Sequence, residues 1–254
     1  MGRKGSDEKT VKPLVLGIDP GRKGAACLIG ERSATLDKST LFEGSGSSPG
    51  DLVPVVEAWW VWSWLEGGKR GPARYRVRGW CRLCSGPDDE EWTTEEATIE
   101  TDGALGAHLA RDAGYSMQCV YPTMTPEERA GRVAVVLEGL YVPPARRQKG
   151  RSKLANNPQS IIPLAEHAGA LLGALQTILA PVSVERPRAS EWRRQILGLP
   201  ARTKAAQAEE YACSMAPRLV HWPEGALPHG LTMAEEGALA ESACMALYGL
   251  RRLG

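Results

Sequence analysis

The sequence of 254 residues predicts an α/β protein in which a mixed β-sheet is flanked by helices. Two short apolar runs within residues 14–29 are joined by a tight turn, which indicates a hairpin at the start of the fold. Two further apolar runs, 132–142 and 182–186, are separated by a helical pattern at 158–180. A strand meander followed by strands that alternate with helices is typical of a sheet with antiparallel and parallel neighbours.

The expected elements follow one another along the chain, each with a local signal. Residues 14–18 and 25–29 form the first two strands, because Pro20 and Gly21 force a turn between them, and a third strand is expected near 34–42. The later elements, which show strand or helix periodicity, are a helix at 103–113, a strand at 132–142, a helix at 158–180, a strand at 182–186 and helices at 203–216 and 233–253.

The segment at about 45–100 differs in composition from the rest and is expected to be an insertion after the third strand. A break rich in Gly, Ser and Pro begins it. Its tryptophans Trp60, Trp62 and Trp64 alternate along the chain, which places three rings on one face of a strand. A small second core is favoured for these rings over stacking on bases.

Composition sets limits on the class of protein. The 31 Lys and Arg residues balance 30 Asp and Glu residues, so the net charge favours no class of partner. The polar residues 1–13 are expected to be a disordered leader, followed by one domain over 14–254. No apolar stretch approaches 18 residues, so we expect no membrane association and a cytoplasmic location.

The six cysteines are scattered along the chain and are expected to be reduced thiols. Cys81 and Cys84 form a C-x-x-C pair, which is half of a zinc site. Because completion of that site would require the distant Cys119 or His108, the sequence leaves zinc and ordinary thiols as alternatives.

Three acidic residues stand where apolar residues are expected. Asp19 ends the first strand, Glu138 interrupts the apolar run at 132–142, and Glu241 lies among small apolar residues of the last helix. Unpaired buried carboxylates are costly, so three on core-facing elements require cations or hydrogen bonds. Mg²⁺ supplies such a cation, and two ions suit an in-line displacement at a phosphodiester. The alternatives are a self-bonded Asp-Pro-Gly turn and glutamates paired with arginines at the surface.

The motif GIDPG, the tetrad EGLY after an apolar strand and the late helix AESACMALYG resemble the RuvC-like Holliday junction resolvases, most closely phage or phage-derived members. The resemblance covers residues 14–30 and about 130–250. It implies an RNase H-like fold and a homodimeric, Mg²⁺-dependent endonuclease that resolves four-way or other branched DNA junctions. It also implies two metal ions in each active site, with Mn²⁺ as a substitute, held by Asp19, Glu138 and Glu241.

The resemblance extends to residues that contact DNA. Tyr141, three residues after Glu138, matches an aromatic residue that inserts at the junction crossover. WRRQILGLPARTK matches a basic residue eleven positions before a lysine, which assigns Arg193 and the catalytic Lys204 to the scissile phosphate, with Gly198 also matching.

The sequence departs from the family at the fourth acid, which usually lies three or four residues before the last one. Those positions hold Ala238 and Gly237, which cannot coordinate a metal. We therefore expect Glu236, at the start of the last helix, to be the fourth ligand, with Glu235 as the alternative. The second metal ion depends on this assignment.

A basic cluster directly follows Tyr141 and contains no acid. Its position beside the expected site favours binding to DNA phosphates over a merely solvated loop. The members of this basic cluster are Arg146, Arg147, Lys149, Arg151 and Lys153. The apolar helix at 158–180 is a candidate dimer surface, with packing on the sheet as an equal alternative.

Three other functions compete with a junction resolvase. Another RNase H-like nuclease, acting on RNA–DNA hybrids or transposon ends, would use the same metal chemistry. A non-catalytic junction-binding relative would explain the missing fourth acid. An actin-like ATPase or sugar kinase would need a later Gly-rich acidic phosphate loop, and the sequence has none.

Overall fold

The structure, a computed structural model, describes most of the chain. The described residues are 13–21, 23–33, 52–65, 74–81, 95–140, 146–148, 151–153, 158–223, 226 and 230–253. Residues 1–12 of the expected leader and residues 34–42, where the third strand is expected, fall outside these ranges, so both expectations remain predictions.

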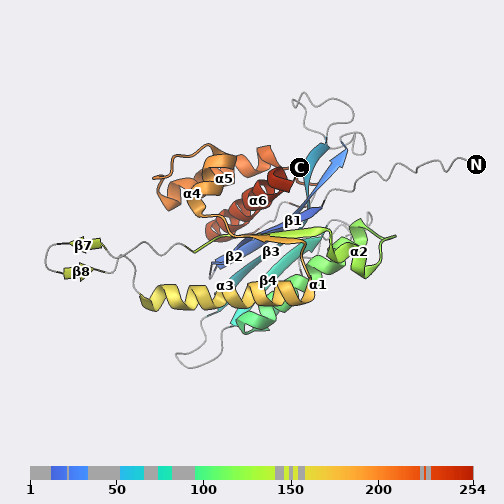
Figure 1. The fold of residues 1–254 in the computed structure, drawn as a ribbon, viewed down its shortest axis with the longest axis horizontal. Helices are drawn as coiled ribbons and strands as arrows, with labels where there is room; N and C mark the ends of the chain where they lie inside the picture. Colours follow the sequence, from blue (N-terminus) through green and yellow to red (C-terminus); the bar gives the residue numbers. More distant parts are fainter. Residues whose placement is uncertain are drawn as a thin grey trace, which may run out of the picture.

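Seven strands form one mixed sheet in the order β5-β4-β3-β2-β1-β6-β9 (Figure 1). Its strands are β1 (Leu14–Asp19), β2 (Lys23–Ser33), β3 (Leu52–Leu65), β4 (Arg74–Cys81), β5 (Glu95–Glu100), β6 (Val133–Leu137) and β9 (Ser183–Glu185). The first five form an antiparallel meander, whereas β6 runs parallel to β1 and β9 runs parallel to β6. The expected α/β fold with a mixed sheet is therefore confirmed.

Helices cover both faces of this sheet (Figure 1). The helices are α1 (Asp102–Val120), α2 (Pro126–Ala130), α3 (Pro158–Ile178), α4 (Ala189–Leu197), α5 (Ala205–Leu219) and α6 (Met233–Leu253). A separate hairpin of β7 (Arg146–Gln148) and β8 (Arg151–Lys153) precedes α3. The helix expected at 233–253 is confirmed. The helix α1 is longer than the expected helix at 103–113, and no helix was expected from the sequence at the position of α4.

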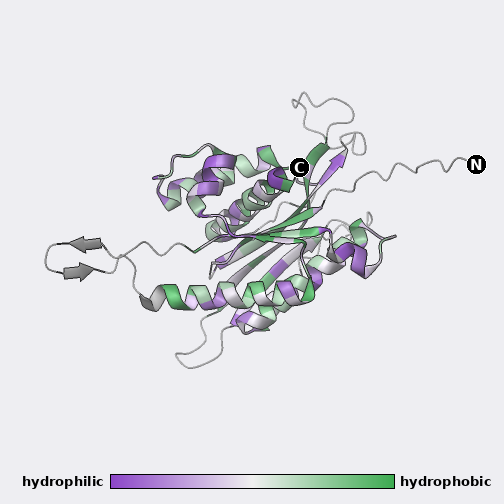
Figure 2. Ribbon diagram, viewed as in Figure 1, coloured by the Kyte–Doolittle hydropathy of each residue, from purple (hydrophilic) through white to green (hydrophobic). Residues whose placement is uncertain are grey.

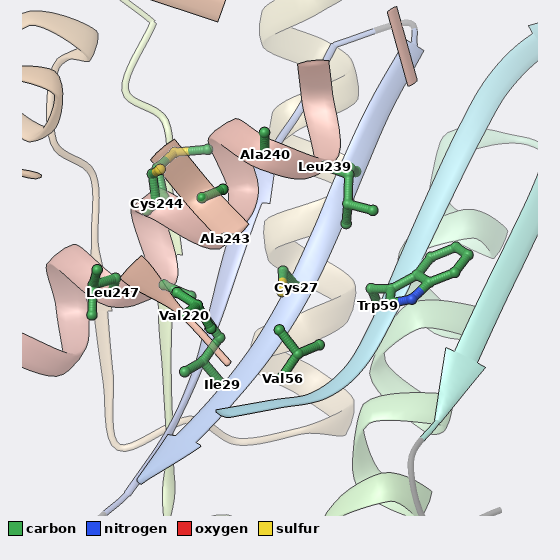
Figure 3. Packing of buried hydrophobic residues seen from close by; sticks show 14 of the residues in the cluster. Cys27, Ile29, Val56, Trp59, Val220, Leu239, Ala240, Ala243, Cys244 and Leu247 are labelled. Carbon is green, nitrogen blue, oxygen red and sulfur yellow. The ribbon is translucent and has the colours of Figure 1, made fainter. Parts of the chain in front are cut away.

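Successive side chains of a strand point to opposite faces of the sheet, so the core forms two layers, one on each face. Val15, Cys27 and Val136 face α4, α5 and α6, whereas Leu16 and Val135 face α1 and α3. Figure 3 shows the first layer, in which residues of β2 and β3 lie beneath α6. Hydrophobic residues follow the central strands in Figure 2. The central strands β1 and β6 are thus buried on both faces.

The segment expected to be an insertion is part of the main sheet. β3 pairs with β2 from Lys23↔Ser63 to Ser33↔Leu52, and β4 and β5 extend the sheet beyond it. Trp60 and Trp62 are buried in the main core and Trp64 is 38% exposed, so the tryptophans form no second core. The alternating tryptophans identified β3 as a strand, but a local pattern does not show which strand β3 pairs with.

The helix α3 contains one stretch, Ile161–Ile178, that is long and apolar enough to cross a membrane by length and composition. A single helix of this kind is weak evidence for a membrane span. Leu171 and Leu175 are buried in the core layer shared with α1, and 22% of the stretch as a whole is buried.

Candidate metal centre

The parallel pairing of β1 with β6 brings the first two acids together. Ile18 pairs with Leu137, so Asp19 and Glu138 follow at the same end of neighbouring strands. The Glu138 amide donates to the Ile18 carbonyl oxygen at 3.2 Å, which continues the pairing. Because parallel neighbours in register point the same way, both carboxylates belong to the face covered by α6.

Two glycines fix the path of α6 across that face. A Cβ at Gly17 would lie 2.1 Å from the carbonyl oxygen of Ser242, and a Cβ at Gly249 would lie 2.5 Å from Cγ2 of Val136. The helix backbone therefore approaches β1 without an intervening side chain. A Cβ at Gly249 would also lie 2.8 Å from Cγ1 of Val15, which precedes Gly17 on β1. Because Ser242 lies over Gly17 and the later Gly249 lies over Val15, α6 runs antiparallel to β1 and carries Glu241 toward the Asp19 end.

Side chains of the helix α4 donate hydrogen bonds to two of the three acids. The Trp192 indole donates to Oε2 of Glu138 at 3.4 Å. Nη2 of Arg193 donates to Oε1 of Glu241 at 2.6 Å. The Arg193 guanidinium also lies 5.2 Å from the centre of the Trp192 ring, a cation–π contact. Neighbouring residues of α4 thus bind one acid from the sheet and one from α6.

The segment before α4 is attached to the end of β6. The Gly139 amide donates to the Pro187 carbonyl oxygen at 2.8 Å, and Gly139 forms a bridge with Arg188. A Cβ at Gly139 would lie 2.7 Å from the Arg186 carbonyl oxygen, so this close approach requires glycine. The glycine after Glu138 therefore positions α4 beside the acids.

The three carboxylates act on one another electrostatically. Burial raises the pKa of Asp19 well above its ordinary value, and the charges of Glu138 and Glu241 raise it further, against the hydrogen bond from the Gly21 amide. Burial and Glu138 raise the pKa of Glu241 to about 7, although Arg193 opposes the rise, and Glu209 adds to it. Burial also raises the pKa of Glu138. When all three carboxylates are ionised, their negative charge exceeds the single positive charge of Arg193, so a further cation would stabilise the ionised forms.

The donor set suits a hard divalent cation. Asp19, Glu138 and Glu241 offer carboxylate oxygens, which Mg²⁺ prefers. As the side chains stand, no three Asp, Glu, His or Cys residues in the described ranges form a group that could hold a metal ion. The Arg193 guanidinium lies on Glu241 and supplies positive charge there. The chemistry of the donors fits the ion, and its coordination would require these side chains to adjust.

The two glutamates considered for the fourth position lie differently. Glu235 is 5% exposed. Its carboxylate accepts a hydrogen bond from the Thr232 amide at 2.8 Å and one from the Arg78 guanidinium at 2.8 Å. Glu236 is exposed and lines a small pocket with Cys213. These hydrogen bonds hold the Glu235 carboxylate at the start of α6. The assignment of Glu236 as the fourth metal ligand stays a prediction.

Other residues from the sequence analysis have definite places. Lys204 is exposed at the N-cap of α5, and Gly198 ends α4 in the left-handed conformation at φ 68°. In the basic cluster, Arg146 and Arg147 belong to β7, and Arg151 and Lys153 belong to β8. Tyr141, Lys149 and Cys84 lie outside the described residues.

The sequence analysis missed Trp192 and Glu209. Trp192 is fully buried. Because it directly precedes Arg193, which matches the family, the sequence could have indicated that Trp192 lies near the site. Glu209 carried no signal, because its place depends on how α5 packs on α6.

No protein-family model matches the chain, and no curated protein matches its sequence.

Proposed function

We propose that the chain is a Mg²⁺-dependent endonuclease with an RNase H-like fold that resolves Holliday or other branched DNA junctions. The observation that carries the proposal is the convergence of three carboxylates, from β1, the end of β6 and α6, on one face of the sheet. Their mutual electrostatic effect at buried positions favours a cation-binding role over a structural one.

The topology supports the RNase H-like assignment. An antiparallel meander, β1 to β3, lies beside a parallel strand, β6, and a C-terminal helix crosses the central strands. The motifs GIDPG, EGLY and AESACMALYG fall at the end of β1, after β6 and in α6. Thus the residues that carried the resemblance lie where a shared site needs them.

The chemistry assigns a role to each side chain. Asp19, Glu138 and Glu241 would hold Mg²⁺, with Mn²⁺ as a substitute and Glu236 as the expected further ligand. Two bound ions would activate water and stabilise the leaving oxygen of the phosphodiester. Trp192 orients Glu138 by its hydrogen bond. Arg193, beside Glu241, and Lys204 would contact the scissile phosphate.

The DNA contacts are proposed on the segment that follows the site. The basic cluster on the β7–β8 hairpin would bind phosphates, and Tyr141 would stack at the crossover.

A homodimer would place two sites on the two strands to be cut. The helix α3 packs on α1 through Leu171 and Leu175 and exposes Ile162 and Ile178, so it offers an apolar surface to a second copy. Figure 2 shows hydrophobic residues along much of α3. We propose a cytoplasmic location, where such DNA substrates are found.

The decisive experiment is cleavage of a labelled four-way junction, compared with linear duplex, single strand and RNA–DNA hybrid. Each substrate is incubated with Mg²⁺, Mn²⁺ or EDTA, beside an Asp19→Asn variant. We expect paired nicks on the junction, lost with EDTA and in the variant.

Two other results would replace the proposal. Cleavage of the hybrid in preference to the junction would assign the chain to a different nuclease class. Tight junction binding without cleavage in either metal would indicate a non-catalytic junction-binding protein.

A further inference from the structure

A carboxylate from α5 occupies the space beside Gly237 of α6. A Cβ built at Gly237 would lie 2.1 Å from Oε1 of Glu209, 2.5 Å from its Cγ and 2.7 Å from its Cδ. The three nearest atoms thus all belong to the Glu209 side chain. Gly237 precedes Glu241 by one helical turn, so the two positions share a face of α6. The Glu209 carboxylate therefore lies on the same face of α6 as Glu241.

The packing of α5 on α6 fixes this position. Ala212 and Ala216 are buried in the core layer that contains α6, and Ala208 is also buried. The small side chains of these alanines permit a close approach of the two helices. Glu209 follows Ala208 at the edge of this contact and is partly buried. Within the described residues, the structure records no hydrogen-bond donor or cation on the Glu209 carboxylate. No described residue therefore competes with a ligand for the oxygens of Glu209.

We propose that Glu209 is a fourth carboxylate ligand of the metal centre, supplied by α5. This inference rests on the proposed function, because it assigns a divalent cation to the same site. It differs from the expectation for Glu236, which is exposed in the first turn of α6. Gly237 is then explained as well: the absent side chain makes the room that the Glu209 carboxylate fills.

The chemistry favours this residue for a second cation. Asp19, Glu138 and Glu241 supply three negative charges, and Arg193 offsets part of that charge. A second divalent ion adds two positive charges, so an additional carboxylate beside Glu241 would stabilise it. Glu209 supplies this carboxylate from a helix, which positions it more firmly than a loop would.

The first test is a Mn²⁺ titration followed by electron paramagnetic resonance, on the full chain without DNA. The variants are Glu209→Gln, which keeps the side-chain shape, and Glu210→Gln as the matched control, because Glu210 is exposed on the same helix. We expect two Mn²⁺ ions in the wild type. In Glu209→Gln we expect the weaker ion to lose about tenfold or more in affinity. Glu210→Gln should bind as the wild type does.

The second test relocates the carboxylate. Glu209→Ala should weaken the second Mn²⁺ ion as Glu209→Gln does. The double variant Glu209→Ala/Gly237→Asp should restore it, because Asp at 237 would occupy the space that Glu209 has vacated. Thermal unfolding in EDTA checks that every variant folds.

The outcomes separate this inference from the proposed function. If the wild type binds two ions and Glu209→Gln binds both with unchanged affinity, Glu209 is no ligand, while the nuclease proposal stands. Restored binding in the double variant supports the assignment, and failure of the folded double variant to bind contradicts it. If the wild type binds no Mn²⁺ and Asp19→Asn changes nothing, both proposals fail together.

Discussion

At the scale of single residues, the site depends on hydrogen bonds that hold carboxylates in place. Trp192 is fully buried and donates to Glu138, and Arg193 binds Glu241. Neighbouring residues of one helix therefore control two acids that come from different elements. A change at either position should alter the site more than it alters the fold.

We predict that Trp192→Phe lowers both Mn²⁺ affinity and junction cleavage by about tenfold, because it removes the donor that orients Glu138. Mn²⁺ titration and initial cleavage rates check this. The control is Trp64→Phe, since Trp64 is 38% exposed on β3. A folded Trp192→Phe variant with wild-type affinity and rate would show that the indole hydrogen bond has no role in the site.

The buried acids also predict how stability depends on pH. Burial and Glu138 raise the pKa of Glu241 from 4.5 to about 7 in the folded chain, whereas the unfolded chain keeps the ordinary value. Between these values the folded state binds more protons, so the free energy of unfolding falls as pH rises from about 4.5 to 7. In EDTA, this loss should be on the order of 1–3 kcal/mol.

Urea unfolding in EDTA at pH 5 to 8 checks this prediction, with Glu241→Gln as the comparison. The variant does not ionise at this position, so its stability relative to the wild type should increase with pH. A constant difference between the two proteins across this range would contradict it.

At the scale of elements, glycines determine how closely α6 packs on the sheet. A Cβ at Gly17 would meet the backbone of Ser242 at 2.1 Å and the Ala246 nitrogen at 2.4 Å. Backbone atoms cannot move aside as a flexible side chain can, so the helix itself would have to shift. The position of Glu241 relative to Asp19 depends on this contact.

We predict that Gly17→Ala lowers the free energy of unfolding by about 1–3 kcal/mol or more. It should also reduce metal affinity, because the shift of α6 separates Glu241 from Asp19. The matched control is Gly173→Ala, since a Cβ there meets no atom within 4 Å and alanine favours the helix. Equal stability of the two variants in urea would refute the close contact.

At the scale of the whole molecule, one sheet connects the segment rich in tryptophan to the site. Arg78 on β4 donates to Glu235 at the start of α6 and to the Gly230 carbonyl oxygen. The side chains of Arg78 and Glu235 are 20% and 6% exposed, so this ion pair is largely shielded from water. The outer strands therefore help to anchor the helix that carries Glu241.

We predict that Arg78→Met lowers the free energy of unfolding by about 1–3 kcal/mol, because it leaves Glu235 without its cation. Arg76→Met is the control, since Arg76 of β4 forms an exposed ion pair with Glu96 of β5, and it should cost about 0.5 kcal/mol or less. Urea unfolding of both variants checks this. If Arg78→Met costs no more than Arg76→Met, β4 does not anchor α6.

The sequence predicted the parts that depend on local patterns. The hairpin around Asp19, the strand before Glu138 and the helix of Glu241 all followed from apolar periodicity and turn residues. The pairing of β3 with β2 did not, because alternating tryptophans fit a second core as well as a longer sheet. Glu209 could not be predicted, since it reaches Gly237 only through the packing of two helices that lie apart in the sequence.

The role proposed for Asp19, Glu138 and Glu241 is the metal-dependent cleavage of branched DNA. The most direct measurement of this role is junction cleavage by the wild type and Asp19→Asn in Mg²⁺. We predict nicks at symmetric positions on two opposing strands in the wild type, and none in the variant or in EDTA. Equal cleavage by the two proteins, or none by either while both fold, would contradict the claim.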